Sequence, residues 1–319
     1  MRHAFLVDPL PGLDVEKDTT IAFMREARRR GHEVFTGGID GLGLAQGASP
    51  VAWLAATQLR DGDPWYETGE SRLLALEGFD VVWMRKDPPV DLNYLYATLI
   101  LSRVPRRTLV VNDPAALRDV NEKLFALRFS ELCPESLVSR SIEELLEFRE
   151  KLGGEMIVKP LFGWGGEGVF HLTPGDRNVR TILEMATRHG AEYQLAQRYI
   201  PEVRKGDKRI IVVEGEPIGA VLRVPQQWET RANFHVGGTP ERAALTPRDR
   251  EICAAVGPEL ARIGVVFAGI DVIGDWLTEI NVTSPTGIRE INRIEGVRLE
   301  IRVLDAVEER VEQLHGGGE

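Results

Sequence analysis

The chain has 319 residues and a formal net charge of −10, with 39 Lys and Arg against 49 Asp and Glu. This acidic balance disfavours sequence-independent binding of nucleic acid, which requires a basic face. Hydrophobic residues make up 43% of the chain and charged residues 28%, as is usual for a globular protein. The two cysteines, Cys133 and Cys253, are far apart, so neither a disulfide framework nor a zinc knuckle is expected.

The N-terminal apolar run, in MRHAFLVDPLPG, is too short for a signal peptide. No run of about 18 uninterrupted apolar residues occurs, so no membrane span is expected. A cytoplasmic protein is therefore predicted. The length favours two domains.

The first third of the sequence alternates strand and helix patterns. A helix is expected over 18–31, where a polar start is followed by a basic last turn and a glycine, and another helix lies between the last two strands. Residues 37–70 are rich in Gly and polar residues and are interpreted as a loop. A small parallel sheet with helices on both faces is therefore predicted for an N-terminal domain, residues 1–119. Its strands are the short apolar runs at 3–8, 32–35, 80–84 and 108–111.

The rest of the chain favours antiparallel pairs. A helix is expected over 112–132, opening at Asp113-Pro114. The segments 208–224 and 265–282 each alternate around a turn and predict two hairpins. An α+β domain over 120–319 is therefore expected. Its other helices and strands are predicted at 141–152, 155–160, 168–172, 178–189, 193–198, 247–263 and 297–313.

The segment MIVKPLFGWGGEGVFHL, residues 156–172, contains a Gly-x-Gly-x-x-Gly pattern. A dinucleotide-binding fingerprint requires a helix after the glycines, but GVFHLTPG has no helix start, so the loop is expected to join two strands. Such a loop can bind phosphate through its N–H groups, and Lys159 on the incoming strand would neutralise charge. A flexible hairpin beside a surface lysine is the alternative, and this stretch alone does not decide between them.

The segment GIDVIGDWLTEINV places Asp271 in one apolar strand and Glu279 and Asn281 on one face of the next. Carboxylate and amide oxygens suit Mg²⁺, which commonly takes one or two carboxylates together with phosphate and water. Because the flanks are apolar, the carboxylates are expected to be buried and to need a cation. A metal site is favoured over three solvated side chains on a polar face.

The register of this hairpin can be tested. A plain two-residue turn at Gly274-Asp275 would place Asp271 opposite Thr278 and send Glu279 to the other side of the sheet. A three-residue connection over 274–276, or a β-bulge, would return Glu279 to the face of Asp271. We predict one of these two.

Three further cations, Lys123, Arg209 and Arg223, flank these segments. With Lys159 they would spread the negative charge of a metal–phosphate group, as phosphoryl transfer requires. Each taken alone is more often a solvated charge. The polar segment 224–242 lacks the hydrophobic periodicity of a helix or strand and is interpreted as a lid. A histidine in such a segment, here His235, is more often a loop residue than a general base.

Several segments, in order over most of the chain, resemble the bacterial glutathione synthetases, which are ATP-grasp ligases. The resemblance implies an α/β N-terminal parallel-sheet (pre-ATP-grasp) domain, followed by an α+β ATP-grasp fold with two antiparallel sheets enclosing ATP. It divides the second domain into a lid subdomain, about 120–197, and a C-terminal subdomain, about 198–319. The segments are MRKDPP, NDPAALRDVNEKLF, IVKPLFGWGGEGVF, VEGEPIGAVL, PQQWETRANFHVGG and LTEINVTSPTGIREI. Two departures are QQWETRANFHVGG, where the family shows a more glycine-rich QGGETRGN, and Glu167-Gly168 in the glycine loop.

The resemblance also implies roles for residues. Lys123 and Lys159 would contact the nucleotide phosphates, the segment 197–200 would read adenine, and Asp207 would bind the ribose. The implied nucleotide-binding set is Lys123, Lys159, Gly163, Gly165, Gly166, Gln197, Tyr199, Ile200 and Asp207. Arg209 and Arg223 would act catalytically beside the transferred phosphoryl group, Asp271, Glu279 and Asn281 would bind Mg²⁺, and 224–240 would be the lid. The implied substrate contacts are Arg85, Lys86, Asp87, Ser284 and Thr286.

The activity implied is ATP-dependent ligation of γ-glutamylcysteine and glycine to give glutathione, ADP and phosphate through an acyl phosphate. Two Mg²⁺ ions, with Mn²⁺ as an acceptable substitute, and a homo-oligomer (dimer or tetramer) are expected. The alternatives are another ATP-grasp carboxylate–amine ligase with a different acceptor, and an ATP-binding module without catalysis. No nucleic acid or membrane partner is expected.

Overall fold

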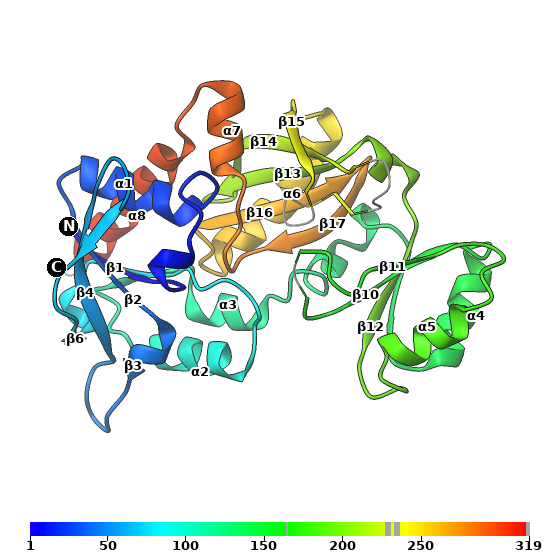
Figure 1. Cartoon of the computed structure of the whole chain (residues 1–319), viewed down its shortest axis with the longest axis horizontal. Coiled ribbons are helices and arrows are strands. Elements are labelled where there is room, and N and C mark those ends of the chain that lie inside the picture. The colour runs from blue at the N-terminus through cyan, green and yellow to red at the C-terminus, as the bar shows by residue number, and fades with distance from the viewer. Residues whose placement is uncertain (164, 227–230, 233–236, 317–319) are drawn as a thin grey trace.

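The computed structural model describes residues 1–163, 165–226, 231–232 and 237–316. This part of the chain forms three sheets, and the third lies between the other two (Figure 1). No helix in the described ranges is long and apolar enough to cross a membrane.

The first sheet has a parallel centre. Its strands β2, β1, β7 and β8 are neighbours in that order, and each pair is parallel. The helices α1 (Thr19–Arg29) and α2 (Leu92–Leu101) begin where Asp18 and Asp91 accept hydrogen bonds from the first free backbone N–H groups. The predicted parallel sheet is confirmed. The strand bounds are β1 Arg2–Leu6, β2 Glu33–Gly37, β7 Val81–Met84 and β8 Leu109–Val111.

The prediction of a loop over 37–70 is wrong. This region contains β3 (Leu42–Gly43), β4 (Val51–Leu59) and β5 (Tyr66–Thr68), and β6 (Arg72–Ala75) follows it. These strands pair antiparallel around β4, which itself pairs antiparallel with β2, so the sheet is mixed. Turn residues on both sides of β4, and its small alanines, obscured the strand.

The second sheet, in the order β11-β10-β12-β9, is antiparallel. Met156 and Val158 on β10 face a core shared with α4 and α5, which cover that side of the sheet (Figure 1). The alternate residues, Ile157 and Lys159, therefore point to the opposite face. The bounds are β9 Ser136–Ser139, α4 Ile142–Lys151, β10 Met156–Pro160, β11 Phe170–Leu172, α5 Val179–Ala186 and β12 Gln194–Arg198.

The third sheet contains both predicted hairpins, in the order β15-β14-β13-β16-β17. The helix α6 (Pro247–Arg262) matches its prediction, whereas α7 (Ile288–Glu295) was not predicted. The last helix, α8 (Leu299–Gly316), returns to pack against α1. The strand bounds are β13 Asp207–Val213, β14 Glu216–Val224, β15 Thr239–Arg242, β16 Phe267–Ile273 and β17 Trp276–Asn281.

The hairpin of β16 and β17 contains the predicted bulge. Ile273 pairs with Trp276, so the turn itself has two residues and the three-residue alternative is wrong. The register then shifts between Asp271 and Val272, and Asp271 comes to lie directly opposite Glu279. The extra residue on β17 thus places both carboxylates on one face of the sheet.

The segment joining the first two sheets is not one helix, contrary to the prediction for 112–132. The helix α3 (Pro114–Asp119) ends at Val120, which is extended, and a 3₁₀ helix follows over Ala126–Leu132. Between them the Asn121 side chain accepts hydrogen bonds from the backbone of Lys123 and Leu124. This local capping replaces helical hydrogen bonds and interrupts the helix.

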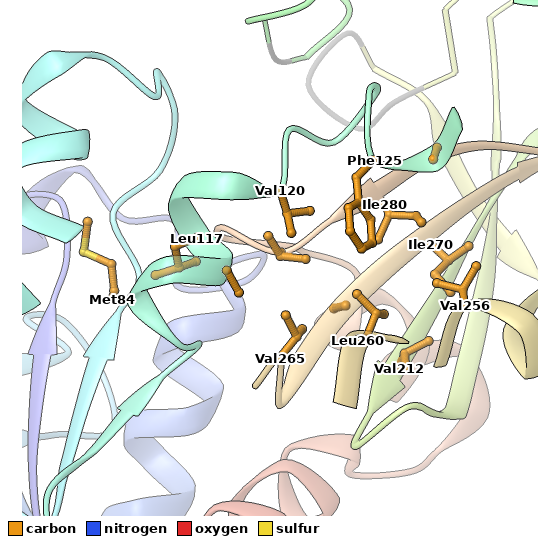
Figure 2. Packing of buried hydrophobic residues seen from close by; sticks show 14 of the residues in the cluster. Met84, Leu117, Val120, Phe125, Val212, Val256, Leu260, Val265, Ile270 and Ile280 are labelled. Atoms are coloured by element: carbon orange, nitrogen blue, oxygen red, sulfur yellow. The ribbon is translucent and has the colours of Figure 1, made fainter. Parts of the chain in front are cut away.

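A continuous apolar core joins the first and third sheets. Figure 2 follows it from Met84 and Leu117 to Phe125 and Ile280, all of which are buried. The division at residue 119 stays a prediction, because the two halves share this core.

A histidine pair joins β1 to the residue that precedes β2. Trp83 Nε1 donates to His3 Nδ1 (3.0 Å), and His3 Nε2 lies 3.0 Å from His32 Nδ1. An indole N–H can only donate, so His3 carries its proton on Nε2 and donates to His32. Burial, together with the nearby His32, N-terminus and Arg30, lowers the pKa of His3 from 6.5 to about 3.

This pKa makes stability depend on pH. Between pH 6.5 and pH 3, His3 is protonated in the unfolded chain but stays neutral in the folded chain. The free energy of unfolding therefore falls as the pH drops toward 3. Lowering the pH from 7.5 to 5 is expected to cost about 2 kcal/mol at this residue. Urea unfolding at both values should show this loss for the parent and for the exposed-site control His315→Gln, and a smaller loss for His3→Leu. An equal loss in all three would contradict the assignment.

Candidate active site

A cavity of about 350 Å³ is lined by the inward face of the second sheet and by the third sheet. The glycine loop, between antiparallel β10 and β11, forms part of its wall. Gly165 and Gly166 have φ of 65° and 79°, a region that strains other residues. The predicted site residues that line the cavity are Asp87, Lys123, Lys159, Gly163, Gly165, Gly166, Gln197, Tyr199, Ile200, Asp207, Arg209, Arg223, Asp271, Glu279, Asn281, Ser284 and Thr286.

Asp271 is held by two arginines. The Arg209 guanidinium donates to both of its oxygens, and Arg223 lies 3.0 Å from Oδ2. The Asn281 amide also donates to Oδ2, at 3.3 Å. Burial opposes ionisation, but Arg209 and Arg223 outweigh it and hold the pKa of Asp271 at about 2. The side chain is therefore a carboxylate at neutral pH.

Glu279 lies between two lysines. Its Oε1 is 3.3 Å from Lys159 Nζ and 3.9 Å from Lys123 Nζ. Burial again opposes ionisation, and Lys123 and Lys159 lower the pKa below its usual range. Two neighbouring carboxylates, each ionised and balanced by cationic side chains, form a donor set that suits Mg²⁺. Among the described residues no group of three or more His, Cys, Asp or Glu could hold a metal ion. The predicted set instead combines the two carboxylates with the amide of Asn281, which contacts Asp271.

Glu122 belongs to the same cluster and was missed from the sequence. It forms an ion pair with Lys123, and burial and the nearby Glu279 raise its pKa. Lys123 also donates to the Gly163 carbonyl at 3.2 Å, which ties the cluster to the glycine loop. The position of Glu122 next to Lys123, a predicted site residue, was the one feature of the sequence that could have indicated its role.

Asp207 has one oxygen without a partner. Its Oδ2 accepts from Arg223, whereas its buried Oδ1 makes no hydrogen bond within the described residues. Burial raises the pKa of Asp207 to about 6. An unpaired acceptor of this kind fits a ligand hydroxyl group.

Part of the cavity lining is apolar, and we call this part the apolar slot. Tyr199 also lines the cavity, and the buried Gln197 donates to Ser136 Oγ at 3.0 Å. A slot with aliphatic walls and backbone groups at its edge is suited to a flat heterocycle. The aliphatic residues lining it are Ile157, Val169, Ile200, Val203 and Ile273.

Two predicted substrate residues do not line the cavity. Arg85 is buried, donates to Thr20 Oγ1 and to the Pro285 carbonyl, and packs against two aromatic rings. Lys86 pairs with Asp8 at 2.9 Å. Arg85 thus positions the loop after β17, which carries Ser284 and Thr286.

Part of the predicted lid lies outside the described residues, and His235 belongs to that part. Within the described part, Arg231 donates to the Gly166 carbonyl at 3.1 Å and lines the cavity. This contact places Arg231 beside the glycine loop.

Among the described residues that line the cavity, six side chains are acidic and six are basic. This part of the lining therefore offers both signs of charge to a ligand. The residues are Asp87, Glu122, Glu167, Asp207, Asp271 and Glu279, and Lys123, Lys159, Arg198, Arg209, Arg223 and Arg231.

Comparison with known proteins decides the family. The family models that match are "Prokaryotic glutathione synthetase, N-terminal domain", over residues 1–118, and "Prokaryotic glutathione synthetase, ATP-grasp domain", over residues 122–296. The chain belongs to the prokaryotic glutathione synthetase family. It is an ATP-grasp ligase with the glutathione synthetase function.

Relatives in the prokaryotic glutathione synthetase family match at full length. The glutathione synthetase of Synechococcus elongatus is 47% identical over 324 residues, covering 98% of this chain and 100% of the relative. That of Brucella melitensis is 47% identical over 312 residues, covering 97% and 99%. Among solved structures, D-cycloserine synthetase DcsG has a TM-score of 0.67 at 16% identity, covering 98% and 100%. The ATP-grasp ligase PsnB, in complex with a minimal precursor, Mg and ADP, has a TM-score of 0.61 at 16% identity, covering 98% of each chain. These two structures support the ATP-grasp fold.

Proposed function

We propose that the cavity binds ATP with its base in the apolar slot and its phosphates between the glycine loop and Glu279. Lys123 and Lys159 contact the phosphates, and the unpaired Oδ1 of Asp207 accepts a ribose hydroxyl. Backbone groups at 197–200 read the base. The cavity lining supports this arrangement, because it brings these elements together from two sheets.

The chemistry follows from the charges around Asp271. The cysteinyl carboxylate of γ-glutamylcysteine attacks the γ-phosphorus of ATP, ADP leaves, and an acyl phosphate forms. Arg209 and Arg223 stabilise the negative charge that spreads over the transferred group. The glycine amine then attacks the acyl carbon, phosphate leaves, and the peptide bond of glutathione is complete. The chain needs no nucleophile of its own for these steps.

Asp271, Glu279 and Asn281 would hold Mg²⁺, which when bound neutralises phosphate charge. Two ions are proposed, because two Mg²⁺ would balance the four negative charges of ATP. Mn²⁺ is expected to substitute, since it accepts the same ligands.

The substrate contacts are proposed at the end of the cavity lined by Asp87, Ser284 and Thr286. Arg85 and Lys86 would act indirectly, by holding the neighbouring backbone. The observation that carries the proposal is the convergence of four cations and three metal-type oxygen donors on one cavity.

Phosphate release tests this function against its rivals. Release is expected only when ATP, Mg²⁺, γ-glutamylcysteine and glycine are all present. A ligase with another acceptor would release phosphate with a different amine, and a non-catalytic module would bind ATP and release none. Either result would overturn the proposed substrates.

A homo-oligomer in a cytoplasmic setting is part of the proposal, supported by family membership and by α2. Leu92, Tyr96 and Leu99 share one face of this helix and are 65%, 56% and 50% exposed. Asp91 and Arg103 lie at opposite ends of this row of exposed apolar residues. If two copies of α2 packed antiparallel, Asp91 of one copy would lie near Arg103 of the other.

The substitution Tyr96→Glu is expected to shift the mass in solution toward the 35.6 kDa monomer, because two like charges would meet in the interface. Size-exclusion chromatography with light scattering measures this. The exposed Asn93→Ala serves as the control. A parent chain that is already monomeric would contradict the oligomer.

A further inference from the structure

Two aromatic rings stack at the wall of the apolar slot. His171 on β11 and Tyr199, just after β12, have ring centroids 4.0 Å apart and an interplanar angle of 20°. Ile157 of β10 lies between their strands, and its Cα partners are His171 on one side and Gln197 on the other. The rings therefore meet across the central strand on the cavity-facing side of the sheet.

The His171 side chain also contacts Glu155. His171 Nε2 lies 2.9 Å from Glu155 Oε1, and the His171 side chain is only 15% exposed. A hydrogen bond to a carboxylate sets the orientation of the imidazole plane. Glu155 thus contacts His171, and His171 contacts Tyr199, which lines the cavity.

Only Tyr199 in this arrangement lines the cavity; His171 and Glu155 do not. Tyr199 follows the end of β12, where a side chain has fewer neighbours to restrict its rotamers. Contact with His171 favours one ring orientation and so keeps that wall of the slot in place before a ligand arrives. Preorganisation of this kind increases affinity by reducing the ordering cost of binding.

We propose that His171, oriented by Glu155, is a positioning residue that holds the Tyr199 ring against the base of the nucleotide and so sets the affinity for the purine part of ATP. The inference rests on the proposed placement of the base in the apolar slot. It assigns His171 no proton transfer and no contact with the reacting atoms.

The test separates base recognition from phosphate recognition. In His171→Ala the dissociation constant of MgATP, measured by calorimetry, is expected to rise about threefold to tenfold, the range of an aromatic pair. The inhibition constant of inorganic tripolyphosphate, which has no base, is expected to stay within twofold. The KM for ATP should rise while kcat stays within twofold of the parent.

Two further variants separate the contribution of the stacked ring from that of the contact with Glu155. His171→Phe keeps a ring for stacking and is expected to restore most of the affinity for MgATP. Glu155→Gln keeps a hydrogen-bonding partner without the charge and is expected to have an intermediate effect. His189→Asn, an exposed histidine in the same part of the chain, is the matched control. Thermal unfolding of each variant shows whether the sheet remains folded.

An unchanged affinity for MgATP in a folded His171→Ala would overturn the inference. Equal weakening of MgATP and tripolyphosphate would also overturn it, because that pattern indicates general loosening of the sheet. Tyr199→Ala separates this failure from failure of the proposed function. If Tyr199→Ala binds MgATP as the parent does, the base slot itself is misplaced; if it binds weakly while His171→Ala does not, only the role of His171 is wrong.

Discussion

Replacing Glu279 by Gln is expected to reduce kcat for glutathione formation by at least about a hundredfold. The change keeps the shape of the side chain and removes the charge that faces Lys159 and Lys123. It also removes one of the two carboxylates proposed to hold Mg²⁺. The lysines, left without this partner, would be drawn to the phosphates in a different geometry.

Initial rates at saturating substrates measure this effect, and a Mg²⁺ titration shows whether the metal requirement has risen. Asp275→Asn is the matched control, because Asp275 is an exposed carboxylate in the turn of the same hairpin. It should retain the parent rate. Undiminished ligation by Glu279→Gln would refute the metal assignment.

Replacing Asn112 by Leu is expected to lower the free energy of unfolding by about 4 kcal/mol or more. The buried Asn112 amide donates to the carbonyls of Phe267 and Val282, at 2.8 and 2.7 Å. Its oxygen accepts from the backbone of Val266 and Phe267, at 2.9 and 3.0 Å. Leu fills a similar volume but leaves these backbone groups buried without partners.

Urea unfolding of the parent and the variant gives the difference. Asn93→Ala, at an exposed position on α2, should change stability by less than about 0.5 kcal/mol. Because Asn112 joins β8 to β16 and the end of β17, the variant should also weaken the contact between the first and third sheets. A decrease of less than about 1 kcal/mol in the free energy of unfolding would contradict this expectation. It would mean that water forms hydrogen bonds with the backbone groups that Asn112 contacts in the parent.

The sequence was most informative where residue spacing has only one structural solution. The separation of Asp271 from Glu279 required a bulge or a longer turn for the two to share a face, and the bulge is present. The absence of a helix start after Gly168 likewise predicted that the glycine loop joins two strands. In both cases few backbone geometries are compatible with the residue spacing.

Other features depend on long-range contacts that local patterns do not contain. The strand β4 is flanked by turn residues and was taken for a loop, although it pairs with four other strands. Glu122 and Asn121 lie where a helix was predicted, and their side chains instead cap the backbone or face the cavity. Arg85 shows the converse: a conspicuous charge in the motif MRKDPP proves to be buried against the rings of Phe23 and Phe267.

The central claim is that the cavity between the second and third sheets activates a carboxylate by phosphorylating it. The most direct measurement uses γ-glutamylcysteine labelled with ¹⁸O in its cysteinyl carboxylate, followed by mass spectrometry of the phosphate released. An acyl phosphate transfers one labelled oxygen to each phosphate as glycine displaces it. We predict labelled phosphate in step with glutathione formation; unlabelled phosphate alongside normal glutathione formation would contradict the account.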